Sequence, residues 1–182
     1  MGQIKPPASV MPIVAVTTRH AQALTWFEER AAGYFGAVAA RSAIFPFTAT
    51  DYYTPSMGEG LQKQFVAFAR LADPARLVDW KVQTNEWEAA YASWGQHAEA
   101  RPLNLDPGYL TLGKLVLAST KDHAHRIYLA RGIYAEVTLY FHAGHWQPRD
   151  WTFPDYRQAA YHEFFDRCRT LLRQAQKAGP TP

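Results

Sequence analysis

The sequence predicts an α+β fold, a single domain in which helices pack on one face of a mixed, mostly antiparallel sheet. Residues 133–142 alternate between apolar side chains and polar or tyrosine side chains, which is the pattern of a half-buried strand. Residues 77–94 repeat apolar side chains at spacings of three and four, which is the period of an amphipathic helix. A length of 182 residues with 48% hydrophobic content suits one core, and no interior linker divides the chain.

Composition and charge bound the kinds of partner and compartment. The net charge of +3 and the lack of any run of like charges permit an anionic ligand or RNA without requiring one. The single cysteine, Cys168, excludes a disulfide framework and a cysteine-rich metal site. No apolar segment approaches the ~18–20 residues that cross a bilayer, and the N-terminus lacks an apolar signal core. We therefore expect a cytoplasmic protein with no membrane contact.

The domain is expected to span residues 11–177. The Pro-rich residues 1–10 predict a flexible N-terminus, and residues 178–182 predict a flexible tail. The first element inside the domain is a buried strand at 12–18, because this short apolar run is rich in β-branched residues. An amphipathic helix follows at 21–35.

The middle of the chain continues this alternation. Residues 37–47 and 61–71 predict two strands, separated by a loop at 48–60 that is rich in Thr, Tyr, Pro and Gly. The helix expected at 73–94 begins with Asp73 as N-cap and a proline in its first turn. Loops with exposed aromatic residues often have a functional role. Tyr52 and Tyr53 of the 48–60 loop either pack as a lid on the core or belong to a functional loop, and the polar face of the hairpin is expected to look away from the core or into a cleft roofed by this loop.

The second half predicts the remaining elements. Residues 101–109 form an extended segment, in which a Pro-Gly pair is expected to turn the chain. Residues 115–120 are apolar and predict another buried strand. The last helix is expected at 154–177, where an apolar face recurs at helical spacing.

A β-hairpin is predicted between the 115–120 strand and the last helix. A two-residue turn would place apolar residues of its first arm on the polar face of the second. A three-residue turn at 130–132 keeps each face uniform and pairs Arg126 with Glu136, so we expect this second register. If solvated, that ion pair would contribute only a few tenths of a kcal/mol.

Charged and polar side chains gather at the entry to this hairpin. Lys121, His125 and Arg126 form a cationic group that suits phosphate or carboxylate. Glu136 or Asp106 could serve as a general base, and His125 as a general acid. Further polar groups and flat stacking surfaces come from Asp122, Asn85, Asn104, Tyr128, Tyr134 and Tyr140. This combination predicts binding or processing of a phosphate-bearing ligand, either a nucleotide or an RNA end.

Metal binding by the protein alone is not expected. His123 and His125, with His142 and His145, could converge if the hairpin brings its ends together, but short His spacings are common by chance and no HExxH helix is present. Carboxylate oxygens could instead share a divalent cation such as Mg²⁺ with the phosphate of a ligand. The sequence also lacks a GxSxG elbow and a reactive cysteine, so no nucleophile is predicted.

A non-catalytic docking module remains the alternative. In that case the Tyr-rich polar face of the sheet would bind RNA or protein, and the charged group would be structural. The two classes differ in geometry, because a catalytic site must be concave, with Asp106, Lys121, His125 and Glu136 converging, whereas a docking face would be open and flat.

Several motifs resemble an uncharacterised bacterial family, domain of unknown function 4416. They are FPFTATDYY at 45–53, TNEWE at 84–88, NLDPGYL at 104–110 and LASTKDHAHRIYLARGIYAEVTLYF at 117–141. The resemblance implies no established activity; some members carry a GTP-binding label, but this chain lacks the GxxxxGK[ST] loop that cradles phosphates. The positions that the resemblance marks as candidate site residues are Asp51, Asn85, Asn104, Asp106, Lys121, Asp122, His125, Arg126, Glu136 and Thr138.

Overall fold

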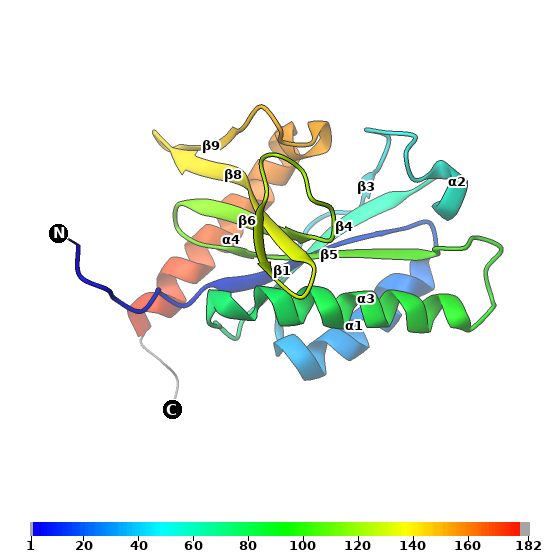
Figure 1. Cartoon of the computed structure of the whole chain (residues 1–182), viewed down its shortest axis with the longest axis horizontal. Helices are drawn as coiled ribbons and strands as arrows, with labels where there is room; N and C mark the ends of the chain where they lie inside the picture. Colours follow the sequence, from blue (N-terminus) through cyan, green and yellow to red (C-terminus); the bar gives the residue numbers. More distant parts are fainter. Residues whose placement is uncertain (1, 179–182) are drawn as a thin grey trace.

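One nine-stranded sheet runs through the protein (Figure 1). The computed structural model describes residues 2–178. The predicted α+β class is confirmed, but all strand pairs within these residues are antiparallel, so the expected mixed sheet is not found there. In spatial order the strands are β2 (Val38–Arg41), β4 (Gln62–Phe68), β1 (Met11–Thr18), β5 (Leu103–Leu110), β6 (Lys114–Ser119), β8 (Ile133–His142) and β7 (Ile127–Ala130), with β3 (Phe45–Pro46) on β4 and β9 (His145–Pro148) on β8.

Helices cover both faces of the sheet, so the expected packing on one face was wrong. α1 (Ala21–Phe35) and α3 (Leu77–Ser93) lie on one face, and α4 (Ala159–Ala178) lies on the other (Figure 1). The physical reason is β1, which is buried along its whole length and therefore needs apolar cover on both sides. Shorter helical segments are α2 (Thr54–Met57), η1 (Pro74–Arg76) and η2 (Pro154–Arg157).

The two faces of β1 define two cores. Val14 and Val16 pack with α1 and α3, and we call this side the α3 face. Ile13 and Ala15 pack with α4, and we call that side the α4 face. Cys168 of α4 is buried in the second core, which raises the pKa of its thiol to about 12 and confirms it as a core residue.

A β-bulge lets β8 contribute to both cores. Val116 of β6 pairs with Val137 and Leu115 pairs with Leu139, which leaves Thr138 as an extra residue in β8. The extra residue reverses the side chains, so Val137 packs on the α3 face and Leu139 on the α4 face. The alternation predicted from the sequence is therefore interrupted in the middle of this strand.

The predicted hairpin register is confirmed, but its turn is shorter than expected. Tyr128 pairs with Tyr134, as the register requires. Ala130 then pairs with Ile133, so the turn contains only two residues, both with positive φ, and Leu129 forms a bulge before it. The expected three-residue turn included Ala130, but in the structure Ala130 is paired and Leu129 is the unpaired residue instead.

The Pro-Gly pair at 107–108 does not turn the chain. Both residues lie within β5, which pairs with β1 over its full length. Towards β6, however, β5 is paired only from Gly108 to Leu110, so residues 103–107 are split away from that neighbour. Pro107 is tolerated in a central strand because it lies at this unpaired edge, where no ladder hydrogen bond is lost.

Gly108 marks the point where the split closes, and Gly108→Ala should destabilise the fold severely. A Cβ there would lie 2.2 Å from the backbone oxygen of Val116 and 2.7 Å from Leu117 Cδ2. Because backbone would have to move, we expect a loss of about 3 kcal/mol or more in the free energy of unfolding, measured by urea denaturation. Gly113→Ala is the matched control, since its Cβ would meet nothing within 4 Å. Similar stabilities for the two variants would contradict this account.

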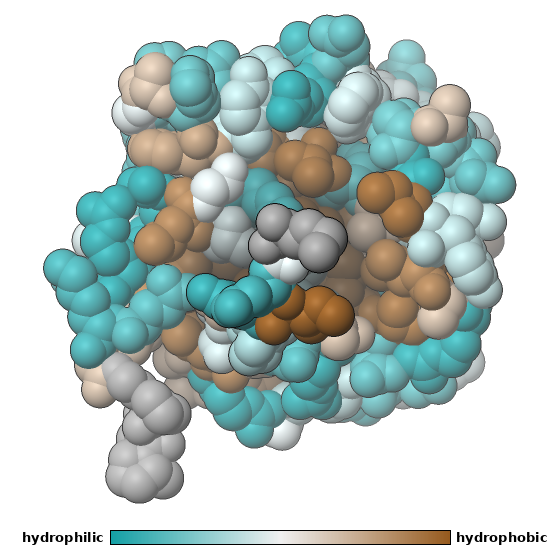
Figure 2. Space-filling model, turned by 60° about the vertical axis from the view of Figure 1, so that its left-hand side comes forward, coloured by the Kyte–Doolittle hydropathy of each residue, from teal (hydrophilic) through white to brown (hydrophobic). Residues whose placement is uncertain are grey.

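The ends of the chain are consistent with one domain from Val10 onwards. Val10 is buried and donates a backbone hydrogen bond of 2.8 Å to the carbonyl oxygen of Ala72. Residues 179–182 of the predicted tail lie outside the described residues. None of the described helices is long and apolar enough to cross a membrane. On the face in Figure 2, hydrophilic residues surround smaller apolar patches.

Candidate functional site

A cleft of about 560 Å³ opens on the α4 face of the sheet. Lys63 of β4 lies two residues before Phe65, and Asp106 of β5 pairs with Ala15, so both side chains point to this face. Glu136 of β8 also lines the cleft. The walls come from connecting segments within residues 47–53, 119–126 and 153–156.

The split between β5 and β6 allows helix α3 to reach the cleft from the opposite face. Lys81 Nζ donates to the backbone oxygen of Leu105 at 2.8 Å, and the N–H of Leu105 donates to Glu88 Oε1 at 2.7 Å. These two side chains replace the backbone hydrogen-bond partners that β6 would otherwise have supplied to Leu105 at the edge of β5. Both therefore line the cleft, together with Asn85 one turn away.

Asp106 is the most accessible acid at the base of the cleft. Lys81 Nζ lies 3.4 Å from Oδ1, and Asn104 Nδ2 donates to Oδ2 at 2.7 Å. Burial alone would raise the pKa of Asp106, but the charges of Lys81 and Lys63, together with these hydrogen bonds, outweigh it and hold the pKa below its usual value. The side chain is 31% exposed, so an ionised carboxylate faces the cleft.

Glu88 and Arg101 connect α3 to the strand that carries Asp106. The guanidinium of Arg101 donates to Asn104 Oδ1 at 2.8 Å and to Glu88 Oε2 at 3.2 Å. Burial raises the pKa of Glu88, against the opposing charges of Lys81 and Arg101 and the N–H of Leu105. Glu88 therefore does not lie on a solvated edge of the helix, because its carboxylate accepts from the backbone of the buried strand β5.

Glu136 is held by three side chains. Arg126 Nε donates to Oε2 at 2.7 Å, and His125 Nε2 lies 2.9 Å from the same oxygen. Thr138 Oγ1 donates to Oε1 at 3.2 Å. The Arg126 side chain is only 4% exposed, so the predicted Arg126–Glu136 pair exists but is buried rather than solvated. Ser119 Oγ fixes the same guanidinium by accepting a bond of 2.6 Å.

A second buried pair closes the cleft on the side of η2. Lys63 Nζ lies 2.5 Å from Asp155 Oδ2, and both side chains are almost fully buried. The ammonium also lies 4.2 Å from the ring centroid of Phe47 and 5.1 Å from that of Tyr156. Asp155 lies in η2, just before α4, but its partner is 92 residues away in the chain.

The mouth of the cleft is bridged by the loop that was expected to roof it. Lys121 Nζ donates to Tyr52 Oη at 2.9 Å and lies 4.1 Å from the ring centroid. This hydrogen bond and the charge of Lys121 lower the pKa of the exposed Tyr52 hydroxyl, whereas burial raises the pKa of Tyr53. Both tyrosines line the cleft.

The structure gathers most of the residues that were singled out from the sequence. Those that line the cleft are Asn85, Asn104, Asp106, Lys121, Arg126 and Glu136. His125 and Thr138 lie behind the wall, where they contact Glu136. Asp51 and Asp122 are exposed and are not part of the lining. The lining residues that the sequence reading did not assign to the site include Lys63, Glu88, Arg101 and Asp155.

The tyrosines and histidines proposed as auxiliary groups have different positions. Tyr128 and Tyr134 contact each other edge to face, and with Tyr140 they lie outside the lining of the cleft. His142 and His145 pair across β8 and β9, and no described group of three possible ligands combines them with His123 or His125. Within residues 2–178, the group close enough to share a metal ion is His20, His97 and Glu99, outside the cleft lining.

Comparison with known proteins identifies the family of this chain and no activity. No curated protein and no solved structure matches it. The family model described as a domain of unknown function, DUF4416, matches residues 8–171, which include every strand and all residues of the cleft. The chain therefore belongs to this family, DUF4416.

Proposed function

We propose that the cleft binds a small phosphate-bearing ligand, such as a nucleotide or an RNA end. The observation that supports this most is the concave cleft of about 560 Å³, which is lined by charged side chains from separate segments of the chain. Ligand pockets for small molecules commonly measure about 300–1,000 Å³. A concave site is the geometry that distinguishes ligand binding from docking on a flat surface.

The distribution of charge favours a ligand whose anionic part lies at the mouth. Deep in the cleft, Lys63 and Arg126 are neutralised by buried acids. Near the mouth, Lys121 contacts only the neutral Tyr52 hydroxyl, and Arg101 is 43% exposed. Phosphate oxygens could accept from these two cations at little desolvation cost. The exposed rings of Tyr52 and Phe153 offer flat surfaces on which a base could stack.

Processing of the ligand would depend on the two acids on opposite walls. Asp106 and Glu136 belong to β5 and β8, which lie on either side of β6. Both line the cleft, so a ligand bound there could lie between them. Asp106, held ionised and facing the cleft, is our candidate general base, and its oxygens would suit Mg²⁺ shared with a phosphate. His125 reaches the site through Glu136, and we assign it to proton transfer through that carboxylate.

The test is a binding screen with a matched pair of lysine variants. We expect at least one nucleotide or short RNA, with or without Mg²⁺, to raise the Tm by roughly 5–10 °C at about 100 times its Kd. Lys121→Ala should weaken that ligand about tenfold, because a charge-assisted hydrogen bond of about 1.4 kcal/mol is lost. The affinity is measured by isothermal titration calorimetry.

Lys114→Ala is the control for this screen. Lys114 is exposed and begins β6, whereas Lys121 follows the other end of the same strand. The control variant should bind as the wild type does. An equal loss of affinity in both variants would place the ligand outside the cleft. If no nucleotide or RNA in the panel raises the Tm of the wild type, the proposal is contradicted.

A second candidate function is docking of another protein along β7. This strand is the sheet edge, and its exposed Ile127, Tyr128 and Leu129 leave an apolar row beside unpaired backbone groups. The simplest such partner would be a second copy of this chain. Light scattering after size exclusion would then show a dimer for the wild type and a monomer for Ile127→Lys; monomers for both would remove this form of the candidate.

We also propose a cytoplasmic location. The supporting observation is that the chain contains a single cysteine, Cys168, and so has no disulfide of the kind that oxidising compartments favour.

A further inference from the structure

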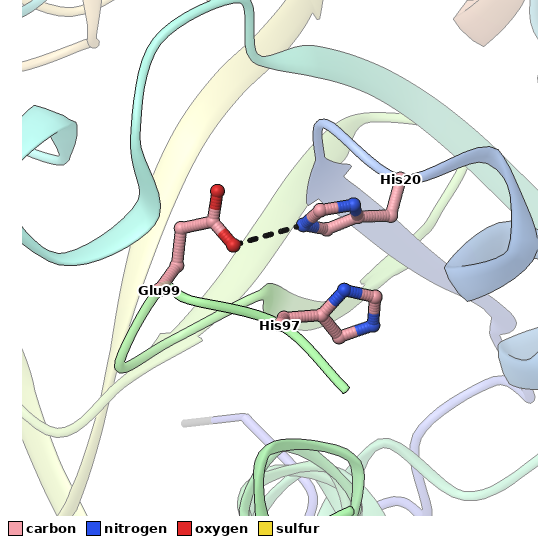
Figure 3. A group of neighbouring side chains, drawn as sticks. All are labelled: His20, His97 and Glu99. Atoms are coloured by element: carbon pink, nitrogen blue, oxygen red, sulfur yellow. Dashed lines mark hydrogen bonds and ion pairs between the residues drawn. The ribbon is translucent and has the colours of Figure 1, made fainter. Parts of the chain in front are cut away.

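His20, His97 and Glu99 form a compact cluster outside the cleft (Figure 3). His20 follows β1 and is the N-cap residue of α1, whereas the other two lie in the connection between α3 and β5. One ligand atom from each residue lies within 4.8 Å of the others. Figure 3 shows the two imidazole rings one above the other, with the Glu99 carboxylate turned towards His20.

The distances in this cluster suit a tetrahedral transition metal. His20 Nε2 and Glu99 Oε2 are 3.2 Å apart. Zinc–nitrogen and zinc–oxygen bonds of about 2.0–2.2 Å at a tetrahedral angle place two ligand atoms about 3.3 Å apart. A metal ion could therefore take the place of the proton between these two atoms with little movement of either side chain. The His20 and His97 ring centroids are 3.9 Å apart, which is closer than the roughly 5 Å expected for two imidazoles on one tetrahedral ion, so the His97 ring would have to swing outwards for its Nδ1 to bind the same ion.

Outer partners already orient two of the three ligands. Tyr91 Oη lies 3.1 Å from His97 Nε2, which leaves Nδ1 for a metal. Arg19 donates to Glu99 Oε1 at 3.0 Å, which leaves Oε2. Outer-shell hydrogen bonds of this kind fix the rotamers of ligating side chains and raise metal affinity.

We propose that His20, His97 and Glu99 bind one divalent transition-metal ion, with Zn²⁺ as the expected ion and the fourth position open to solvent. A set of two histidines and one carboxylate with an open position is a common zinc arrangement. All three ligands are only partly buried, so an ion and its water can reach them. The alternative is a plain ion pair of Glu99 with Arg19 and His20, which would bind no metal.

Metal binding here would also stiffen one wall of the cleft. The connection that carries His97 and Glu99 continues to Arg101, whose backbone N–H donates to Ser56 in α2 at 2.9 Å. Arg101 lines the cleft. A metal ion would thus tie the start of α1 to the segment that positions this arginine, without itself being part of the ligand site.

The test uses the full chain without an affinity tag, stripped with a chelator. We expect one Zn²⁺ per chain by isothermal titration calorimetry, and a Tm that rises by roughly 5–10 °C at about 100 times the Kd. Co²⁺ should give the visible absorption of four-coordinate cobalt, and Zn²⁺ should abolish it. His97→Ala should weaken binding more than 100-fold, whereas Tyr91→Phe, which removes only an outer partner, should weaken it about 10-fold.

The controls separate loss of a ligand from loss of folding. Glu99→Gln keeps the shape and the oxygen that accepts from Arg19 but removes the charge, so it should fold as the wild type and still lose most of the affinity. His142→Ala removes one of the exposed histidines of the β8–β9 hairpin and should change nothing. Binding weaker than about 1 mM in the wild type would overturn the proposal. Binding that survives both His97→Ala and Glu99→Gln would also overturn it.

Discussion

Replacing Asp155 with alanine is expected to lower the free energy of unfolding by about 3–5 kcal/mol. The variant would leave the Lys63 ammonium buried beneath Phe47 and Tyr156 without its carboxylate partner. An uncompensated buried charge costs more than the ion pair contributes, because water cannot replace the lost partner. For a chain of this size the loss corresponds to a decrease in Tm of roughly 6–20 °C.

Urea denaturation of matched variants measures this effect. Asp79→Ala is the control, because Asp79 pairs with Arg131 at a surface position where both side chains are about half exposed. That change should stay within about 1 kcal/mol. The double variant Lys63→Met with Asp155→Leu should recover much of the loss, since two apolar groups need no partner. Equal costs for Asp155→Ala and Asp79→Ala would show that the first pair is solvated in solution.

The Glu136→Ala variant should lose a similar amount, about 3–5 kcal/mol, for a related reason. Arg126 is almost fully buried, and its guanidinium would keep only the Ser119 hydroxyl and the Lys121 carbonyl as acceptors. Neither acceptor is charged. His125 would lose its carboxylate partner as well. Urea denaturation and the ligand titration should be run on the same preparation, because the proposed function predicts that binding falls together with stability.

Glu28→Ala provides the comparison for this second effect. Glu28 pairs with an arginine too, since Arg41 donates two hydrogen bonds to its carboxylate, but this pair lies at an exposed position. Its removal should cost no more than about 1 kcal/mol. The loss in the free energy of unfolding for Glu136→Gln should lie between those for Glu136→Ala and Glu28→Ala, since the amide oxygen can still accept from Arg126 while the charge is gone. If Glu136→Ala were no worse than Glu28→Ala, the cleft would have to be far more hydrated than its burial indicates.

Local patterns in the sequence were sufficient for the elements of the fold. The apolar period of α3 predicted a helix within one residue of its C-terminal end, and the apolar run of β1 predicted a buried strand. The hairpin register followed from keeping each face uniform, which is a constraint between residues close in the chain. These features depend on interactions within one element or between sequence neighbours, so the pattern by itself contains the information.

The candidate site was only half visible in the sequence. Asp106, Lys121, Arg126 and Glu136 were found because charged residues cluster near the hairpin or stand in a distinctive motif. Asp155 was missed because an acid near the start of a helix has a sufficient local explanation as a cap. No local pattern tells that its partner is 92 residues away in β4. A lysine within an apolar strand, Lys63, was the one signal that could have indicated a buried pair.

The sequence by itself determined the α+β class, the order of most elements, and the pairing of Ile127 and Tyr128 at the hairpin, but not β9, α2 or the division of residues 37–47 into two strands. Tertiary structure alone decided that α4 covers the face opposite α3, that β5 separates from β6, and that Lys81 and Glu88 fill this split. The cleft and the His20–His97–Glu99 cluster each bring together residues that are far apart in the chain. Whether such residues meet depends on how the layers pack, and not on the period of any one segment, so only the tertiary structure shows them.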